Sequence, residues 1–262
     1  MSETKKFEEL FLAQSAEENL KINHIKILII NNINSNNLYL FKLKEWQIKQ
    51  NIYFDYLLFL GNFLSFSEND KNSIKEIAND EAQTGGLISY LENLCLNVIY
   101  IGGNNDAVTL FRKPFPSLTV KSKNIHQNFL KLAEDLYMIG FGGNINGNNM
   151  HQLEDTFEAL KKYINDNDKI KNYQIILVNN DNYYENKDTK LIYEHLLKNK
   201  ENNIFLNING NPKEKQGTFK LYDTTIINPG SINEGNIGIL DLDRDINTNN
   251  SWKIKNIEYI II

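Results

Sequence analysis

The chain has 262 residues, and its 28 Lys and Arg against 33 Asp and Glu give a formal net charge of −5. This balance, without a run of basic residues, argues against general nucleic-acid binding and against adsorption to anionic membranes. The single cysteine, Cys95, cannot form an internal disulfide and fits a reducing compartment. No apolar run approaches the ~20 residues that span a bilayer, and the first residues lack the apolar region of a signal peptide. We therefore expect a soluble cytoplasmic protein without membrane insertion, and association with the cytoskeleton stays open as an alternative.

Short apolar runs alternate with amphipathic stretches, which is typical of a layered α/β domain. We expect a helical extension at residues 1–24 and a single domain at 25–262. Buried strands are predicted at 25–30, 56–60, 98–101, 136–141, 174–178 and 204–208. Helices are predicted at 38–49, 72–93, 125–133, 153–165 and 187–198. After residue 217 only strands are predicted, at 218–222, 225–228, 237–243 and 252–262. Consecutive strands at the end of the chain predict mixed or antiparallel pairing there.

About one residue in six is Asn, far above ordinary usage, and many of these residues directly follow a predicted strand. The strand-end loops are 31–36 (NNINSN), 61–63 (GNF), 102–106 (GGNND), 179–181 (NND) and 210–217 (GNPKEKQG), with NPGS at 228–231 after a later strand. In open α/β folds, functional residues gather at the carboxyl ends of strands. The loops are therefore candidates for one common site.

In this order the loops resemble the motifs of the calcineurin-like metallophosphoesterases: D-x-H, G-D, G-N-H-D/E, a lone His and G-H-x-H. The NPGS segment is similar to one found in small members of that family. The resemblance runs from about residue 25 to 243 and implies an α/β fold with four layers, an α/β/β/α sandwich with mixed sheets. It also implies that the strand-end loops of this chain occupy the positions of a two-metal site.

The first three motifs are altered mainly by Asn. By the resemblance, Asn32 and Asn34 stand at the Asp and His of D-x-H, and Asn62 stands at the metal-bridging Asp of G-D. Asn104 keeps the family residue of the third motif, whereas Asn105 replaces its His, the usual general acid. Four of these five positions have therefore lost the residue that the family uses.

The remaining motifs are altered in the same way. Asp106 keeps the acidic position of G-N-H-D/E, Asn179 stands at the lone His, and Asn211 and Lys213 replace both His of G-H-x-H. We expect Asn32, Asn62, Asn104, Asn179 and Asn211 to converge on one cleft. Within it, Lys213 either pairs with Asp106 or points to solvent. The four histidines lie outside the motifs and are expected at the surface or at helix caps: His24, His126, His151 and His195.

Such a residue set does not favour metal catalysis. Two divalent ions in one site need a bridging carboxylate and several imidazoles, and a neutral amide oxygen is a poor ligand for transition metals. We therefore expect no bound metal, no other cofactor and no enzyme activity. The leading hypothesis is a pseudoenzyme that serves as a scaffold subunit of a larger protein assembly, as the resemblance implies from relatives in replicative DNA polymerases and retromer. The alternatives are a metal-independent binder of a phosphate-bearing ligand and a phosphoesterase with unusual ligands.

Three other features have simpler interpretations. Cys95 lies in an apolar helical stretch and is expected in the core. The glycines at 140–143 (GFGG) lack the spacing of a dinucleotide or phosphate cradle and are expected in a tight turn. Phe63 and Phe66 are expected in the core, with a role as interface anchors left open.

Overall fold

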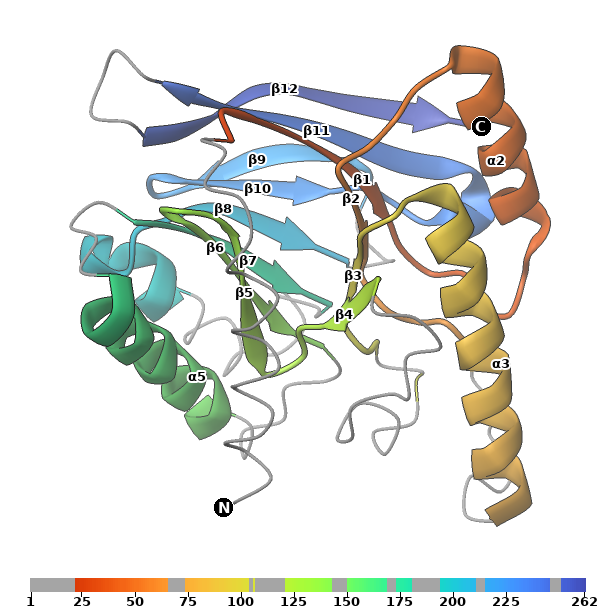
Figure 1. Cartoon of the computed structure of the whole chain (residues 1–262), viewed down its shortest axis with the longest axis horizontal. Helices are drawn as coiled ribbons and strands as arrows, with labels where there is room; N and C mark the ends of the chain where they lie inside the picture. Colours follow the sequence, from red (N-terminus) through yellow and green to blue (C-terminus); the bar gives the residue numbers. More distant parts are fainter. Residues whose placement is uncertain are drawn as a thin grey trace.

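The computed structural model describes residues 22–65, 74–103, 106, 121–142, 150–168, 173–180, 194–210, 215–245 and 251–262. Within these residues the chain forms two mixed sheets of six strands each (Figure 1). The first sheet has the order β12 (Ser251–Ile261), β11 (Asn236–Asp245), β1 (His24–Ile30), β2 (Tyr56–Phe59), β3 (Val98–Tyr100), β4 (Ser122–Asn124). The second sheet has the order β5 (Asn128–Ala133), β6 (Leu136–Phe141), β7 (Gln174–Asn179), β8 (Ile204–Asn209), β10 (Thr224–Asn228), β9 (Gly217–Leu221).

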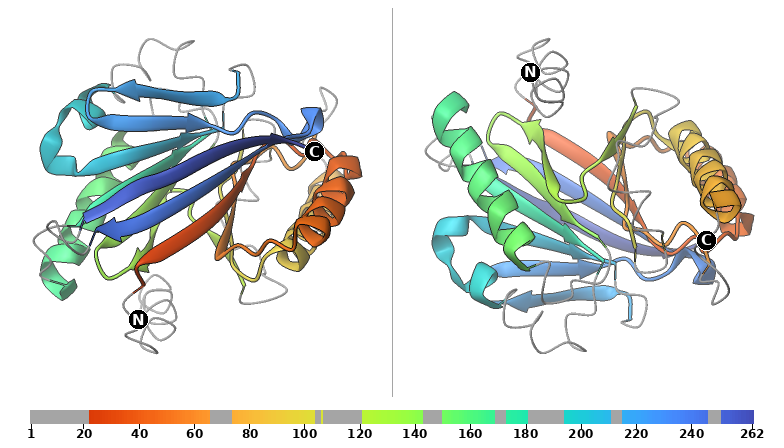
Figure 2. Two further views of the ribbon diagram at one scale, coloured as in Figure 1. Left: turned by 90° about the horizontal axis from the view of Figure 1, so that it is seen from above. Right: turned by 90° about the horizontal axis from the view of Figure 1, so that it is seen from below.

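Helices cover the outer face of each sheet (Figure 2). The first sheet carries α2 (Leu38–Gln50) and α3 (Ile74–Leu94), and the second carries α5 (Met150–Tyr163), which continues into a π-helical turn at Ile164–Asp168. Two short 3₁₀ helices lie at Lys200–Asn202 and Ile232–Glu234. The layers are therefore helix, sheet, sheet and helix, which confirms the predicted four-layer α/β/β/α sandwich with mixed sheets.

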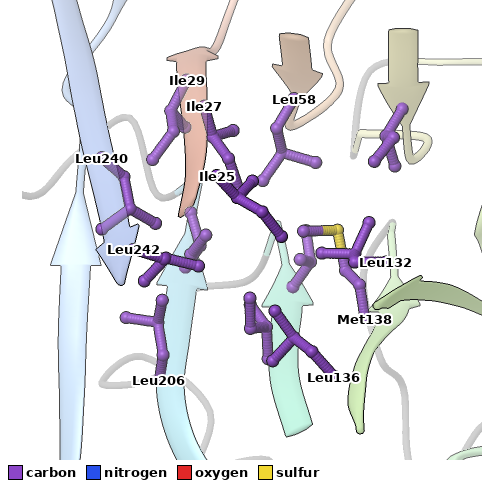
Figure 3. Close-up of a cluster of buried hydrophobic side chains, with 14 of the residues drawn as sticks. Ile25, Ile27, Ile29, Leu58, Leu132, Leu136, Met138, Leu206, Leu240 and Leu242 are labelled. Atoms are coloured by element: carbon purple, nitrogen blue, oxygen red, sulfur yellow. The ribbon is translucent and has the colours of Figure 1, made fainter. Parts of the chain in front are cut away.

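Side chains that alternate along each strand build the cores between the layers. In β1, Leu28 and Ile30 pack in the cluster beneath α2 and α3, whereas Ile27 and Ile29 face the second sheet. Figure 3 shows this inter-sheet core, in which side chains of β1, β2 and β11 meet those of β6 and β8. A third cluster lies between the second sheet and α5. The strands predicted as buried are continuous apolar runs because both of their faces are covered, one by helices and the other by the opposite sheet.

A polar cluster joins the two sheets at the end of the sandwich opposite the carboxyl ends of the parallel strands. Arg244 Nη2 lies 2.7 Å from Asp135 Oδ2, and the indole Nε1 of Trp252 donates to Asp135 Oδ1 at 2.8 Å. Gln174 Nε2 donates to the carbonyl of Trp252 at 3.0 Å. Because Asp135 precedes β6 whereas Arg244 and Trp252 belong to β11 and β12, the cluster fixes the sheets to each other.

Several predictions of local structure are wrong. In place of the helix predicted at 125–133, residues 128–133 form β5, which pairs antiparallel with β6. Gln127 has a φ of 52°, which no helix interior adopts, and pairing with β6 overrides the helical spacing of the apolar residues. The strand β4 was not predicted. Phe63 is fully buried, with its ring centroid 4.2 Å from that of Phe59, so its role as an interface anchor is wrong.

Other predictions are confirmed or lie outside the described residues. Cys95 is buried directly after α3, where burial raises the pKa of its thiol. Residues 194–198 are helical, whereas 187–193, Phe66 and residues 1–21 lie outside the described part, so the N-terminal extension stays a prediction. Among the helices that the structure describes, none has the length and hydrophobicity of a membrane span.

Candidate functional site

The loops after β1 and β2 lie side by side because these strands are parallel neighbours. The backbone N–H of Asn32 donates to the Gly61 carbonyl at 3.1 Å, and that of Asn34 donates to the Asn62 carbonyl at 3.0 Å. Asn32, Asn34 and Asn62 have φ values of 59°, 49° and 59°. This left-handed conformation is tolerated by Asn better than by most residues with a side chain. Asn at these positions therefore also serves the backbone geometry of the loops.

A bond between two side-chain amides joins these loops. Asn62 Nδ2 donates to Asn32 Oδ1, and the two residues are 3% and 1% exposed. The Nδ2 of Asn32 is buried and has no hydrogen-bond partner. The resemblance assigns these two positions to metal-binding carboxylates. In this chain they hold neutral side chains that form a hydrogen bond with each other.

A second set of amides crosses from the first sheet to the second. Asn180 Nδ2 donates to Asn31 Oδ1 at 3.3 Å and also to the Leu60 carbonyl, while Asn31 Nδ2 donates to the Gly210 carbonyl. Asn31 and Asn180 are fully buried. These two residues were not among the predicted site positions. Through them the loop after β1 is held to the loops after β7 and β8.

Asn179 does not join this cluster. Val178 packs between the sheets and Leu177 packs beneath α5, so alternation places Asn179 on the same outer face as Leu177. Both polar atoms of its side chain are buried without a hydrogen-bond partner. In this loop it is the side chain of Asn180, not that of Asn179, that reaches the loops after β1 and β2. Counting in twos from Val178 would have found this, because residue 180 falls on the inter-sheet face.

The carboxylate of Asp106 joins the loop after β2 to the loop after β3 through hydrogen bonds with backbone N–H groups. Its Oδ2 accepts the N–H groups of Asn62 at 2.8 Å and Gly103 at 2.9 Å, and its Oδ1 accepts that of Leu64 at 3.2 Å. Burial raises the pKa of this carboxyl to about 6, although the backbone hydrogen bonds oppose the shift. Asn104, Asn105, Asn211 and Lys213 lie outside the described residues. The pairing of Lys213 with Asp106 therefore stays a prediction.

Glycines allow the loops to approach closely. Gly61 has a φ of +94°, and a Cβ there would overlap the backbone of Gly103. A Cβ on Gly142 would overlap the carbonyl of Gly102. The expected tight turn at 140–143 is wrong in part, because Gly140 lies within β6. The described glycines of this segment instead let the second sheet contact the loop after β3.

Comparison with known proteins places the fold. No protein-family model and no curated protein matches the sequence. Among solved structures, TT1561 of Thermus thermophilus aligns at a TM-score of 0.60 and 18% identity, over 88% of this chain and 98% of that one. Another crystal structure aligns at 0.61 and 19%, over 90% of this chain and 100% of the other. The chain has the calcineurin-like phosphoesterase fold. A novel archaeal phosphodiesterase also aligns, at a TM-score of 0.39 and 15% identity over 91% of this chain and 100% of that chain.

The likeness to these structures is one of fold. Among the described residues, His, Cys, Asp and Glu side chains form no group of three that fits a metal ion. His126 was expected at the surface or at a cap, but it is half-buried near the loops, and its Nδ1 accepts the Gly142 N–H at 2.9 Å. Burial lowers the pKa of this imidazole to about 4, so it is neutral at pH 7. His24 and His195 are exposed, as expected.

Proposed function

We propose that this chain is a non-catalytic protein of the phosphoesterase fold that serves as a structural subunit of a larger protein assembly. The observation that carries the proposal is the hydrogen bond between Asn62 and Asn32. At these positions an active site would present carboxylates to metal ions. Here the amide oxygen of Asn32 accepts a hydrogen bond from the amide of Asn62, so this oxygen has a partner without any ion.

The donor set does not fit two dications. Unit charges 4 Å apart at an effective dielectric constant of 20 repel by about 4 kcal/mol, and two dications by about four times as much. Carboxylates offset this repulsion in metal sites, whereas Asn31, Asn32, Asn62 and Asn180 carry no charge. Asp106, the acidic residue among the described loops, directs both of its oxygens at backbone N–H groups. The residue set therefore does not fit hydrolysis by a metal-activated water.

A scaffold subunit needs a rigid fold more than a reactive site. The hydrogen bonds that the side-chain amides of Asn31 and Asn180 make between the loop after β1 and the loops after β7 and β8 support this role. They hold the two sheets together where a metal centre would otherwise do so. The alternative of a metal-independent phosphate binder depends on Lys213 and stays a prediction. Inorganic phosphate or a nucleotide at 100 times its dissociation constant would raise the free energy of unfolding by about 2.7 kcal/mol.

The test combines isolation from native cells with an assay of the purified chain. We expect the chain to co-purify with other proteins at constant stoichiometry through successive columns. The isolated chain should not hydrolyse bis(4-nitrophenyl) phosphate in the presence of Mn²⁺. A chain that purifies alone and turns over this substrate, with the turnover lost in Asn62→Ala, would refute the proposal.

A further inference from the structure

The helix α2 is apolar on two opposite faces. Leu40 and Leu43 are buried against the first sheet. On the outer face, Leu38, Phe41 and Ile48 are 55%, 54% and 67% exposed. Positions 38, 41, 45 and 48 share one face of a helix, and three of these four are large apolar residues. A helix that is apolar on both faces is typical of one covered on both sides.

Two further exposed apolar side chains lie on segments near the carboxyl end of α2. Tyr53 and Leu96 are 78% and 68% exposed. Hydrogen bonds hold their segments together: Gln47 Nε2 donates to the Leu94 carbonyl at 2.9 Å, and Asn97 Nδ2 donates to the Asp55 carbonyl at 3.0 Å. Together they form a surface that we call the α2 stripe, made of Leu38, Phe41, Ile48, Tyr53 and Leu96. Five of the eight exposed large hydrophobic side chains among the described residues therefore belong to α2 or to the two segments bonded near its carboxyl end.

The net charge of α2 itself differs in sign from that of the whole chain. The helix α2 carries Lys42, Lys44 and Lys49 against Glu45, which is 3 − 1 = +2, while the chain carries −5. Lys44 Nζ donates to the Asn93 carbonyl at 2.7 Å, and Lys42 lies over the ring of Tyr39. The stripe thus suits an occupant that combines apolar side chains with acidic ones.

We propose that the α2 stripe binds the N-terminal segment of its own chain, residues 7–14. This segment places Phe7, Leu10 and Phe11 at i, i+3 and i+4 spacing, as one face of a helix requires. Glu8 and Glu9 lie between these anchors and complement the lysines of α2. A short amphipathic segment on an apolar surface is a common mode of recognition.

The place where the segment joins the described chain favours this occupant. The described part begins at Ile22, and the N–H of Asp55 donates to the Lys26 carbonyl at 2.9 Å. The start of β1 therefore lies beside the connection that carries Tyr53. Between Gln14 and Ile22, eight residue steps span up to about 27 Å in extended form, which exceeds the length of about 20 Å of a 13-residue helix such as α2.

The test uses cross-linking in the full chain with the anchors left intact. Gln14→Cys is combined with Lys49→Cys beside Ile48, and a short bismaleimide is added at micromolar protein concentration. The matched control combines Gln14→Cys with Asp223→Cys, which lies in the exposed turn between β9 and β10. The native Cys95 is buried and is common to both variants.

We expect the first pair to form a link within one chain at least tenfold more efficiently than the control. Adding Leu10→Ser and Phe11→Ser should remove this excess. A link between two chains that grows with concentration would assign the stripe to a second copy and overturn the proposal. Equal linking of both pairs would also overturn it and leave the stripe to a separate protein.

Discussion

Replacing Arg244 by Met is expected to lower the free energy of unfolding by about 3–5 kcal/mol at neutral pH. The side chains of Arg244 and Asp135 are 9% and 7% exposed, and they lie 2.7 Å apart. Without the guanidinium, the Asp135 carboxylate stays buried without the charge that compensates it in the native chain, which destabilises the fold. The measurement is denaturant unfolding of both proteins.

The control for this effect is an exposed pair on neighbouring strands. Lys253 lies 3.0 Å from Asp245 and its side chain is 58% exposed, so Lys253→Met is expected to cost less than about 1 kcal/mol. The double variant Arg244→Met with Asp135→Asn should be more stable than Arg244→Met alone, because no buried charge remains and the amide still accepts from Trp252. Equal losses for Arg244→Met and Lys253→Met would show that the cluster does not join the sheets.

Replacing Asp106 by Ala is expected to destabilise the loops of the candidate site, with a cost that depends on pH. The substitution removes the acceptor of three N–H groups, those of Asn62, Leu64 and Gly103, at about 1–3 kcal/mol for each buried donor left unpaired. The total is therefore several kcal/mol. Chemical denaturation at pH 4 to 7 measures it.

The direction of the pH dependence follows from the raised pKa of Asp106. The carboxyl has a pKa near 3.8 in the unfolded chain and about 6 in the fold. Ionisation opposes folding, so the contribution of Asp106 to stability is greatest below pH 3.8 and declines by about 3 kcal/mol in total as the pH rises through 6 to above 7. The unfolding free energy of the native chain relative to Asp106→Asn should fall by that amount over this range.

Asp223 provides a control of opposite sign. Lys200 lowers the pKa of Asp223 through a hydrogen bond at 2.7 Å. Its stabilising contribution is therefore present above pH 3.8 and lost as the pH falls through the folded pKa. The stability of the native chain relative to Asp223→Asn should rise with pH. A flat difference for Asp106→Asn would contradict the assignment of a raised pKa to this carboxyl.

The sequence predicted the layers well, because the buried strands are apolar runs of strand length between amphipathic helices. It failed at 125–133, where the apolar spacing fits a helix but pairing with β6 decides the structure. It also failed at the loop after β7. The motif resemblance selects Asn179, whereas the alternation of β7 directs Asn180 to Asn31. Two adjacent Asn look alike in a motif, and only strand register distinguishes their faces.

Asn31 shows a further limit of sequence reasoning. It precedes the D-x-H position, and no motif names it, but its amide holds the Gly210 carbonyl on the second sheet. That contact depends on how the two sheets pack face to face. Spacing along one strand carries no information on such packing, so the residue could not be identified from its own loop.

Neutral amides hold the loops of this site without metal ions. The direct test is thermal unfolding of the EDTA-treated chain with and without Mn²⁺ or Zn²⁺, alongside Asn32→Ala/Asn62→Ala. We predict that neither ion stabilises the native chain and that the double variant is less stable in all conditions. An ion at 100 times its dissociation constant would stabilise by about 2.7 kcal/mol, and such a gain, lost in the double variant, would contradict the account.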